Sequence, residues 1–563
     1  MFAVELNRAN YEYDVNAIVK AFYPQEQVMV LTPECGEAKR EKLKGDIRIR
    51  AVLDGDGACV TVDGQEYTWN RRQEDFDSGE LGIQPAVEMK SDSAGKQQGK
   101  TEVNSVGRAM EDSEASAAGE AAEDSEQGSA GEEADQEKEY KYGFKCFLYR
   151  VLCQVTGREL PWGNLTGIRP TKIAYVMLEQ GRSEQEIEEY YRKRYYVSAE
   201  KARLSIDIAK RERALLSCIR PGEMTEDGDR MEDRARTGNG DEGAGYSLYV
   251  GIPFCPSTCL YCSFTSFPIA GYRKTVDSYL GCLMAEIEYT ASCYRDRRLD
   301  TVYVGGGTPT TLEAGQLAGL LAGIRRSFDF SEVKEFTVEA GRADSITEEK
   351  LRVLREYGVT RISVNPQTMR QETLDLIGRK ASAEQVVEAF RLARRVGFDN
   401  INMDLILGLP GETAEDVRYT MDKVSELAPD SLTVHSLAIK RASRLNQWVQ
   451  ENGVDLLNNT DETMEIAAEG AKRLGLVPYY LYRQKNMSGN FENVGYAREG
   501  KLGLYNILIM EELQTIIAVG AGSISKRVYP DGRIERCENV KEISQYIERI
   551  GEMIERKRVL LED

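Results

Sequence analysis

The sequence predicts an α/β protein whose main domain is a partial (β/α)6 barrel. From residue 246 onward, short apolar runs of strand length alternate with amphipathic helical patterns. The apolar runs lie at 248–254, 301–304, 335–339, 361–365, 401–409 and 431–439. Helical patterns lie between them, among others at 276–291, 347–357, 383–396 and 414–427. Six such alternations predict parallel strands joined by right-handed crossovers, with active groups gathered at the carboxyl ends of the strands.

Further segments precede and follow the predicted barrel, which spans 246–440. A small N-terminal α/β unit is predicted at 1–71, with a helix at 11–22, strands at 27–31 and 46–53, and a hairpin at 59–69 turning at Asp63-Gly64. Residues 72–139 are rich in Gly, Ser, Ala, Glu and Asp, which predicts a disordered acidic insertion. Amphipathic helices are predicted at 140–219 with an interruption at 164–172, a polar linker at 220–245, and a C-terminal α/β appendage at 441–563.

Three cysteines follow the first strand of the predicted barrel with the spacing C-x3-C-x2-C. They are Cys255, Cys259 and Cys262. A loop of this kind suits a [4Fe–4S] cluster, and three thiolates leave one iron with an open coordination position, as catalytic metal sites do. Buried apolar cysteines or half of a zinc site remain as alternatives, although zinc would need a second CxxC or an HxxxH, and His435 is the only histidine. A disulfide framework is disfavoured because the chain is long and has 11 cysteines, an odd number.

Composition narrows the classes of protein to which the chain can belong. The sequence of 563 residues is 41% hydrophobic and has no apolar run as long as a membrane span. Its start lacks a basic segment followed by an apolar one, and its reduced cysteines fit the cytoplasm. The formal net charge of −20 argues against general nucleic-acid binding because polyanions are repelled over long range.

The cysteine loop and the residues before it resemble a known family. The run Tyr249-Val-Gly-Ile-Pro-Phe-Cys255 and the cysteine spacing resemble the radical S-adenosylmethionine (SAM) superfamily, in its oxygen-independent coproporphyrinogen III oxidase branch. Phe264 stands where some members have a fourth cysteine, and Gly251 where many have histidine. Both departures fit the HemZ-type coproporphyrinogen dehydrogenase subgroup, whose signature the segment 164–172 also resembles. The resemblance implies a radical-SAM barrel with a cluster on the three cysteines, whose open iron is chelated by SAM.

The resemblance also implies a SAM site at the ends of successive strands. A glycine run at 305–307 lets the backbone approach a ligand closely, carboxylate and amide oxygens accept hydrogen bonds from ribose hydroxyls, and a guanidinium suits the SAM carboxylate. The implied cofactor-binding residues are Tyr249, Gly306, Gly307, Thr308, Glu339, Gln367, Arg379 and Asp404. Each taken alone is equally compatible with an ordinary polar residue at a strand end. Their order on successive strands favours the site.

The activity implied by the resemblance is oxidative decarboxylation of the propionates of coproporphyrinogen III to vinyl groups, giving protoporphyrinogen IX. The resemblance also implies a small electron donor such as flavodoxin or ferredoxin. His435 is a candidate acid or hydrogen-bond donor for the substrate, and it is equally compatible with a structural role. The tyrosine-rich segment 479–496 and the glycine loop 519–525 resemble segments that cover the barrel mouth. Two alternatives remain: a haem-trafficking protein, which the lack of a histidine before Asn506 disfavours, and another radical-SAM enzyme, such as one that modifies RNA.

Overall fold

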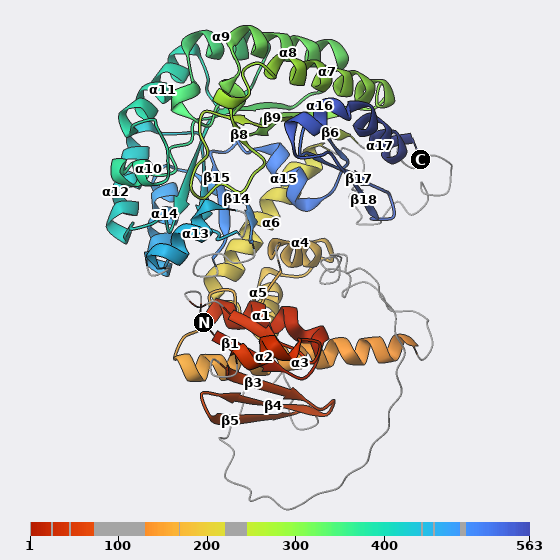
Figure 1. Ribbon diagram of the computed structural model, residues 1–563, viewed down its shortest axis with the longest axis vertical. Helices are drawn as coiled ribbons and strands as arrows, with labels where there is room; N and C mark the ends of the chain where they lie inside the picture. The colour runs from red at the N-terminus through yellow and green to blue at the C-terminus, as the bar shows by residue number, and fades with distance from the viewer. Residues whose placement is uncertain are drawn as a thin grey trace, which may run out of the picture. The chain divides into compact units, whose positions relative to one another are not determined.

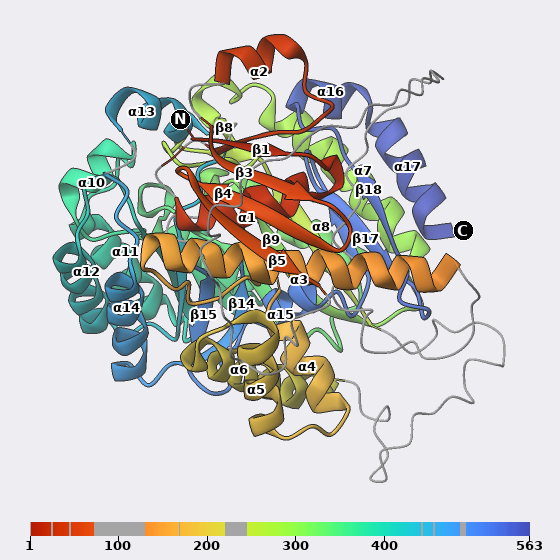
Figure 2. The same cartoon turned by 90° about the horizontal axis from the view of Figure 1, so that it is seen from below.

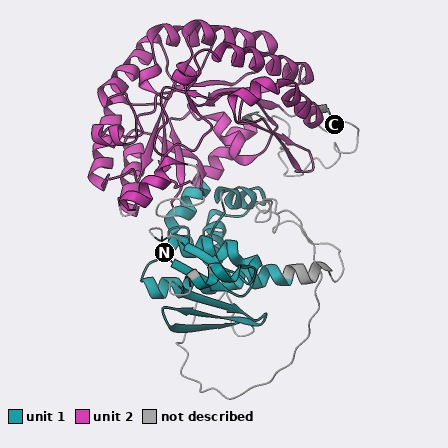
Figure 3. Cartoon of the chain, in the orientation of Figure 1, with its two compact units in different colours: residues 1–206 teal, residues 207–563 magenta. Residues whose placement is uncertain are grey.

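The computed structural model describes residues 2–23, 26, 28–43, 47–71, 130–167, 169–219, 245–440, 443–453, 456–484 and 491–562. The chain divides into two compact units, 1–206 and 207–563, which are coloured separately in Figure 3. The predicted polar linker and most of the predicted acidic insertion lie outside the described residues. Among those described, no helix is long and apolar enough to cross a membrane.

The N-terminal unit is a five-stranded sheet covered by helices. Its strand order is β2-β1-β3-β4-β5, from β1 (Phe2–Leu6), β2 (Val28–Leu31), β3 (Ile47–Leu53), β4 (Gly57–Val62) and β5 (Gln65–Asn70). The first three strands are parallel, and β4 and β5 form the predicted hairpin, with Asp63 and Gly64 both at positive φ. Helices α1 (Glu12–Phe22) and α3 (Ala130–Thr156) contribute to one apolar core with the sheet, and Figure 2 shows α3 crossing it.

Some elements of the N-terminal unit were not predicted. They are β1, α2 (Glu37–Leu43) and the start of α3, which begins at Ala130 inside the segment assigned to the acidic insertion. The helices α4 (Thr171–Glu179), α5 (Glu184–Tyr195) and α6 (Ala199–Ile219) follow, as the amphipathic pattern predicted.

The second unit contains the six predicted strands as parallel neighbours in sequence order. They are β6 (Tyr246–Ile252), β9 (Leu299–Gly306), β10 (Glu335–Glu339), β11 (Arg361–Ser363), β12 (Ile401–Leu407) and β13 (Ser431–Ser436). Helices between them form an outer layer in Figure 1: α7 (Val276–Cys293), α8 (Ala314–Ser327), α9 (Glu348–Glu356), α11 (Ala383–Val396) and α12 (Ala414–Leu427). The predicted partial (β/α)6 arrangement is confirmed.

The C-terminal segment extends this sheet at both edges. Beyond β13 lie β15 (Asn493–Ala497) and β14 (Val477–Tyr482), both antiparallel to their neighbours. Beyond β6 lie the parallel β16 (Ile516–Val519), then β17 (Ile524–Val528) and β18 (Ile534–Glu538). Of the segment 479–496, predicted to cover the barrel mouth, residues 479–482 lie in β14 and 493–496 lie in β15.

Short elements complete the second unit. The pair β7 (Phe254–Cys255) and β8 (Phe267–Pro268) brackets the cysteine loop. The remaining helices are α10 (Gln371–Leu376), α13 (Arg444–Asn452), α14 (Asp461–Arg473), α15 (Leu504–Glu511), α16 (Ile543–Glu548) and α17 (Ile550–Glu562).

A buried ion pair joins α7 to α17. Glu286 and Lys557 are both 0% exposed, and the Lys557 Nζ lies 2.5 Å from a Glu286 carboxylate oxygen. The same carboxylate accepts hydrogen bonds from the Asn539 side chain (2.7 Å), the Gly520 amide (2.8 Å) and the Tyr546 hydroxyl. The pair therefore ties α7, α16, α17 and the loop after β16 together at one point.

Candidate functional site

The cysteine loop is held by segments that follow other strands. The Leu260 amide donates to the Ile377 carbonyl at 2.9 Å, and the Leu445 amide donates to the Leu260 carbonyl at 2.9 Å. The Ser257 hydroxyl donates to the Gly378 carbonyl at 3.1 Å. These contacts come from the connection after β11 and from the start of α13, so the loop lies at the carboxyl ends of the parallel strands, where β/α folds place their active groups.

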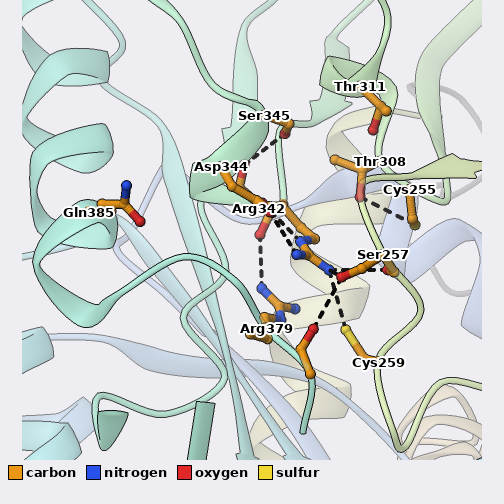
Figure 4. Close-up of polar contacts among 12 residues, drawn as sticks. Cys255, Ser257, Cys259, Thr308, Thr311, Arg342, Asp344, Ser345, Arg379 and Gln385 are labelled. Carbon is orange, nitrogen blue, oxygen red and sulfur yellow. Dashed lines mark hydrogen bonds and ion pairs between the residues drawn. The ribbon is translucent and has the colours of Figure 1, made fainter. Parts of the chain in front are cut away.

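Each of the three thiols has a polar neighbour. The Cys255 sulfur lies 3.5 Å from the Thr308 hydroxyl, the Cys262 sulfur 3.7 Å from the Ser266 hydroxyl, and the Cys259 sulfur 3.6 Å from Nη1 of Arg342 (Figure 4). Burial raises the pKa of the Cys255 thiol to about 11, the Thr308 contact opposes this, and the charges of Cys262 and Cys259 add to it.

The donor set fits an iron–sulfur cluster. Three thiols on one loop, close enough to influence one another electrostatically, match the soft ligands that such a cluster takes, and the neighbouring donors match the hydrogen bonds that tune it. Among the residues that the structure describes, no three His, Cys, Asp or Glu side chains are placed to hold a single metal ion.

The glycine run at the end of β9 packs directly on the start of the cysteine loop. The Gly307 amide donates to the Ile252 carbonyl at 2.8 Å, and the Thr308 amide donates to the Phe254 carbonyl at 2.7 Å. A Cβ added to Gly307 would stand 2.6 Å from the Phe254 carbonyl oxygen, closer than real Cβ contacts come. Gly307 is therefore required by the close approach of two backbones.

Glu339, the last residue of β10, lies beside two tyrosines and the glycine run. The Tyr303 hydroxyl donates to its Oε1 at 2.5 Å. Burial raises the pKa of the Glu339 carboxyl to about 7, with the Asp404 charge adding to the rise, while the Tyr303 hydroxyl and the Gly306 amide lower it. The Tyr249 ring is stacked with that of Tyr303, at a centroid distance of 6.1 Å. Its hydroxyl would be 3.1 Å from a Cβ on Gly306, so the structure brings Tyr249, Gly306 and Glu339 together.

Gln367 and Arg379 follow the fourth barrel strand. Gln367 has a φ of 69°, unusual for a residue with a side chain, and its buried Oε1 has no hydrogen-bond partner among the described residues. Such a buried unpaired acceptor suits a bound ligand that donates hydrogen bonds. The Arg379 guanidinium donates to the Asn365 carbonyl at 2.7 Å and to the Tyr261 hydroxyl at 3.1 Å, which places it beside the cysteine loop.

Asp404 on β12 and His435 on β13 are diagonal neighbours, since the register pairs Asp404 with Thr433 and Ile406 with His435. Asp404 Oδ1 accepts a hydrogen bond from the Asn402 amide group at 2.6 Å, and its Oδ2 is 4.0 Å from His435 Nε2. The His435 Nδ1 is 3.3 Å from the Tyr482 hydroxyl. Burial lowers the pKa of His435, with the Asp404 charge opposing the shift. The imidazole is therefore favoured in its neutral form at pH 7, with a polar neighbour for each nitrogen.

The part of the chain that carries this site matches known proteins. Residues 249–424, which contain the three cysteines and every implied cofactor-binding residue, match the family model of the radical SAM superfamily. The chain is 41% identical over 421 residues to the oxygen-independent coproporphyrinogen-III oxidase-like protein HemZ of Bacillus subtilis (strain 168), covering 74% of this chain and 80% of the relative. The chain belongs to the radical SAM superfamily and to its HemZ family.

Other relatives of this HemZ-family chain carry two different names. The heme chaperone HemW of Bacillus subtilis (strain 168) is 31% identical over 309 residues, which are 54% of this chain and 76% of the relative. The oxygen-independent coproporphyrinogen III oxidase of Escherichia coli (strain K12) is 34% identical over 192 residues, 34% of this chain and 42% of the relative. The solved coproporphyrinogen III oxidase (HemN) from Escherichia coli aligns at 25% identity with a TM-score of 0.45, covering 55% of this chain and 70% of that chain.

Membership in the radical SAM superfamily identifies the cofactors of the HemZ-family protein. They are a [4Fe–4S] cluster and SAM, as predicted from the cysteine spacing and the family resemblance. The cysteines Cys255, Cys259 and Cys262 would hold the cluster. The family uses the cluster and SAM together for radical chemistry.

Sequence reasoning missed several residues of this site. They are Arg342 with its partner Asp344, which lie beside Cys259, the tyrosines Tyr303 and Tyr261, and the role of Tyr505, whose ring stacks on Tyr303 at 4.5 Å. A charged residue just after the third strand is a signal that was present for Arg342. The tyrosines on β9 and α15 gave no local signal.

We expect Gly307→Ala to destabilise the HemZ-family fold, because the added methyl group has no space against the Phe254 carbonyl. Overpacking of this kind costs about 1–3 kcal/mol in the free energy of unfolding. Denaturant-induced unfolding monitored by circular dichroism measures the loss. Gly315→Ala is the matched control, because nothing lies within 4 Å of its Cβ position on α8. That control should be neutral or stabilising by up to about 1 kcal/mol. Equal stability of the two variants would contradict the close packing of the glycine run.

Proposed function

We propose that the protein is an oxygen-independent coproporphyrinogen III dehydrogenase, a radical-SAM oxidoreductase of the cytoplasm. It would convert two propionate side chains of coproporphyrinogen III to vinyl groups with loss of CO2, giving protoporphyrinogen IX. The cysteine loop, with Gly307, Thr308 and Arg379 beside it, is the observation that carries the radical-SAM part of the proposal. The name of the 41% identical relative supports the porphyrinogen substrate.

The protein's own groups would bind and orient the cofactors. Gly306, Gly307 and Thr308 present backbone groups beside the cysteine loop for the SAM amino group. Glu339, Gln367 and Asp404 offer oxygens to the nucleoside, and Arg379 offers a guanidinium to the SAM carboxylate. Tyr249, in the middle of β6, places its hydroxyl beside Gly306. When bound, the cluster and SAM supply a one-electron cleavage and a radical that abstracts hydrogen from the substrate.

The test is an anaerobic assay of the protein with its cluster reconstituted. SAM, a chemical reductant or reduced flavodoxin or ferredoxin, and coproporphyrinogen III are supplied, and 5′-deoxyadenosine and porphyrin products are measured in the same reaction. We expect both products to appear. Deoxyadenosine without protoporphyrinogen would retain the radical-SAM assignment and reject this substrate, and the absence of both would reject the proposed enzyme.

A haem-binding carrier is the second candidate, favoured by the 31% identity to a heme chaperone over 54% of this chain. Tyr505, in the segment where related haem-trafficking proteins carry histidine, is buried and stacked on Tyr303. A carrier would bind haem with a defined stoichiometry and give no protoporphyrinogen. Absorption titration with haem, carried out beside the assay above, separates the two functions.

The proposed SAM site predicts that binding weakens as the pH falls. Burial raises the pKa of Glu339 to about 7, so its carboxylate is present above pH 7 and is lost below it. Since ribose hydroxyls need that carboxylate as acceptor, the Kd for SAM should rise as pH falls through about 7. Hydrogen bonds to charged groups contribute about 1.5–3 kcal/mol, so Glu339→Gln should weaken binding roughly tenfold to hundredfold above pH 8 and flatten the pH profile.

Anaerobic calorimetry on the cluster-loaded protein measures this profile. Tyr303→Phe is the informative companion variant, because it removes a donor that favours the carboxylate and should move the midpoint to higher pH. A profile of Glu339→Gln that keeps the wild-type midpoint would show that another group titrates.

A further inference from the structure

Arg342 is a buried cation directed at the cysteine loop. It lies just after β10, is 3% exposed, and was not among the residues expected at the site. Its Nη1 is 3.6 Å from the Cys259 sulfur and also donates to the Ser257 carbonyl at 3.2 Å and the Ser257 hydroxyl at 3.0 Å. Figure 4 shows the guanidinium between Asp344 and the loop that carries Cys259.

The carboxylate of Asp344 fixes the orientation of this guanidinium. Arg342 Nε donates to Asp344 Oδ1 at 3.0 Å, and Nη2 donates to Oδ2 at 2.8 Å, which is a bidentate pair. Because the guanidinium is planar, fixing two nitrogens directs the third, Nη1, toward Ser257 and Cys259. The Arg342 backbone carbonyl also accepts from the Ser345 hydroxyl at 2.7 Å, so the main chain at this position is held as well.

We propose that Arg342 raises the reduction potential of the cluster through Cys259, and that Asp344 orients Arg342 and partly offsets its charge. Hydrogen bonds to the sulfurs and nearby charge are what a protein uses to set the potential of an iron–sulfur cluster. Reduction adds one negative charge, so a buried cation beside a ligating sulfur favours the reduced form. Arg342 acts through Cys259 and is a positioning residue. The inference rests on the cofactors of the family and is independent of the substrate.

The sign of the effect makes the inference testable. Arg342→Met removes the cation and the N–H donor while keeping an unbranched side chain, so it should lower the midpoint potential. We expect the ratio of reduced to oxidised cluster at a fixed potential to fall about tenfold, which is about 59 mV for one electron. Asp344→Asn removes the opposing negative charge, keeps one side-chain oxygen that can accept from the guanidinium, and leaves the two Nη1 contacts to Ser257 intact. It should therefore shift the midpoint in the opposite direction.

The measurement is a redox titration of the reconstituted protein followed by electron paramagnetic resonance, without SAM. Arg352→Met is the matched control, since this arginine lies on α9, its side chain is 71% exposed, and it forms an ion pair with the exposed Glu348 on the same helix. Its midpoint should equal that of the wild type. Iron and sulfide content establish that each variant carries a full cluster.

Opposite shifts for Arg342→Met and Asp344→Asn support the inference. Two shifts of the same sign, or two unchanged midpoints in fully loaded protein, overturn it. Where Arg342→Met does not retain the cluster, Asp344→Asn decides alone: a raised midpoint supports the inference, and an unchanged or lowered one overturns it. A loss of SAM cleavage without any change in midpoint would assign Arg342 a purely structural role.

Discussion

Cys259→Ala is expected to abolish reductive cleavage of SAM. The change removes one of the three proposed thiolate ligands from the cysteine loop and also the sulfur that faces Arg342. Changes in groups that merely surround a metal ligand already cost roughly 10- to 100-fold in affinity or activity. Loss of the ligand itself should therefore reduce 5′-deoxyadenosine formation by more than about a hundredfold, with a parallel loss of iron and sulfide after reconstitution.

A cysteine outside the loop provides the control for this prediction. Cys282 lies on α7, and its sulfur contacts the Ile547 carbonyl at 3.8 Å rather than another thiol. Cys282→Ala should load a normal cluster and form 5′-deoxyadenosine at the wild-type rate. Normal iron content and activity in Cys259→Ala would exclude this residue as a cluster ligand and contradict the assignment of the loop.

Lys557→Met is expected to give the largest loss of folding stability. It leaves the Glu286 carboxylate buried without its cation, although Asn539, Tyr546 and the Gly520 amide still donate to it. Breaking a buried ion pair on one side costs about 3–5 kcal/mol in the free energy of unfolding, because a charge is left uncompensated. Guanidinium-induced unfolding of the cluster-free protein, kept reduced, measures the loss.

Two further variants separate the ion pair from general damage to α17. Glu286→Gln combined with Lys557→Met removes both charges and should recover part of the stability lost in Lys557→Met alone. Arg558→Met on the same helix removes an exposed partner of Glu555 and should change stability by no more than about 1 kcal/mol. A double variant as unstable as the sum of its single changes would show that the two charges are not coupled.

The strands of the barrel could be predicted because each is visible as a short segment of the sequence by itself. Parallel strands buried on both faces read as continuous apolar runs, and all six runs became strands of the expected order. The spacing of Cys255, Cys259 and Cys262 is equally local. The strands β14 and β15 were missed because the reason for their residues lies in the pairing between them. Gly495 lies opposite Tyr480 in this pair, and a Cβ on Gly495 would overlap the Tyr480 ring. Tyrosine and glycine in this segment therefore form a strand pair that composition alone presents as a loop.

The residues of the candidate site also fall into two groups, those visible in the sequence and those revealed only by tertiary contacts. Glu339 and Gln367 could be proposed because strand ends are visible in the sequence, and the structure places the Glu339 carboxylate beside Gly305 of the glycine run. The contact between Cys259 and Arg342 joins residues 83 positions apart and depends on the paths of two loops. The stacking of Tyr505 on Tyr303 depends on where α15 packs. Tertiary contacts of this kind have no periodicity or spacing to reveal them.

The completion of the sheet by β16 has a consequence for biosynthesis. β6 pairs with β16, which is made about 270 residues later, so that edge of the sheet gains its partner only after those residues have been synthesised. At roughly 5–20 residues per second the nascent edge remains open for many seconds, a period in which a chaperone would shield it. Thr265, just past the third cysteine, packs against Gly522 of the same late segment. The surroundings of the cysteine loop are thus complete only after the segment that follows β16 has been made, and we expect cluster insertion to follow its synthesis.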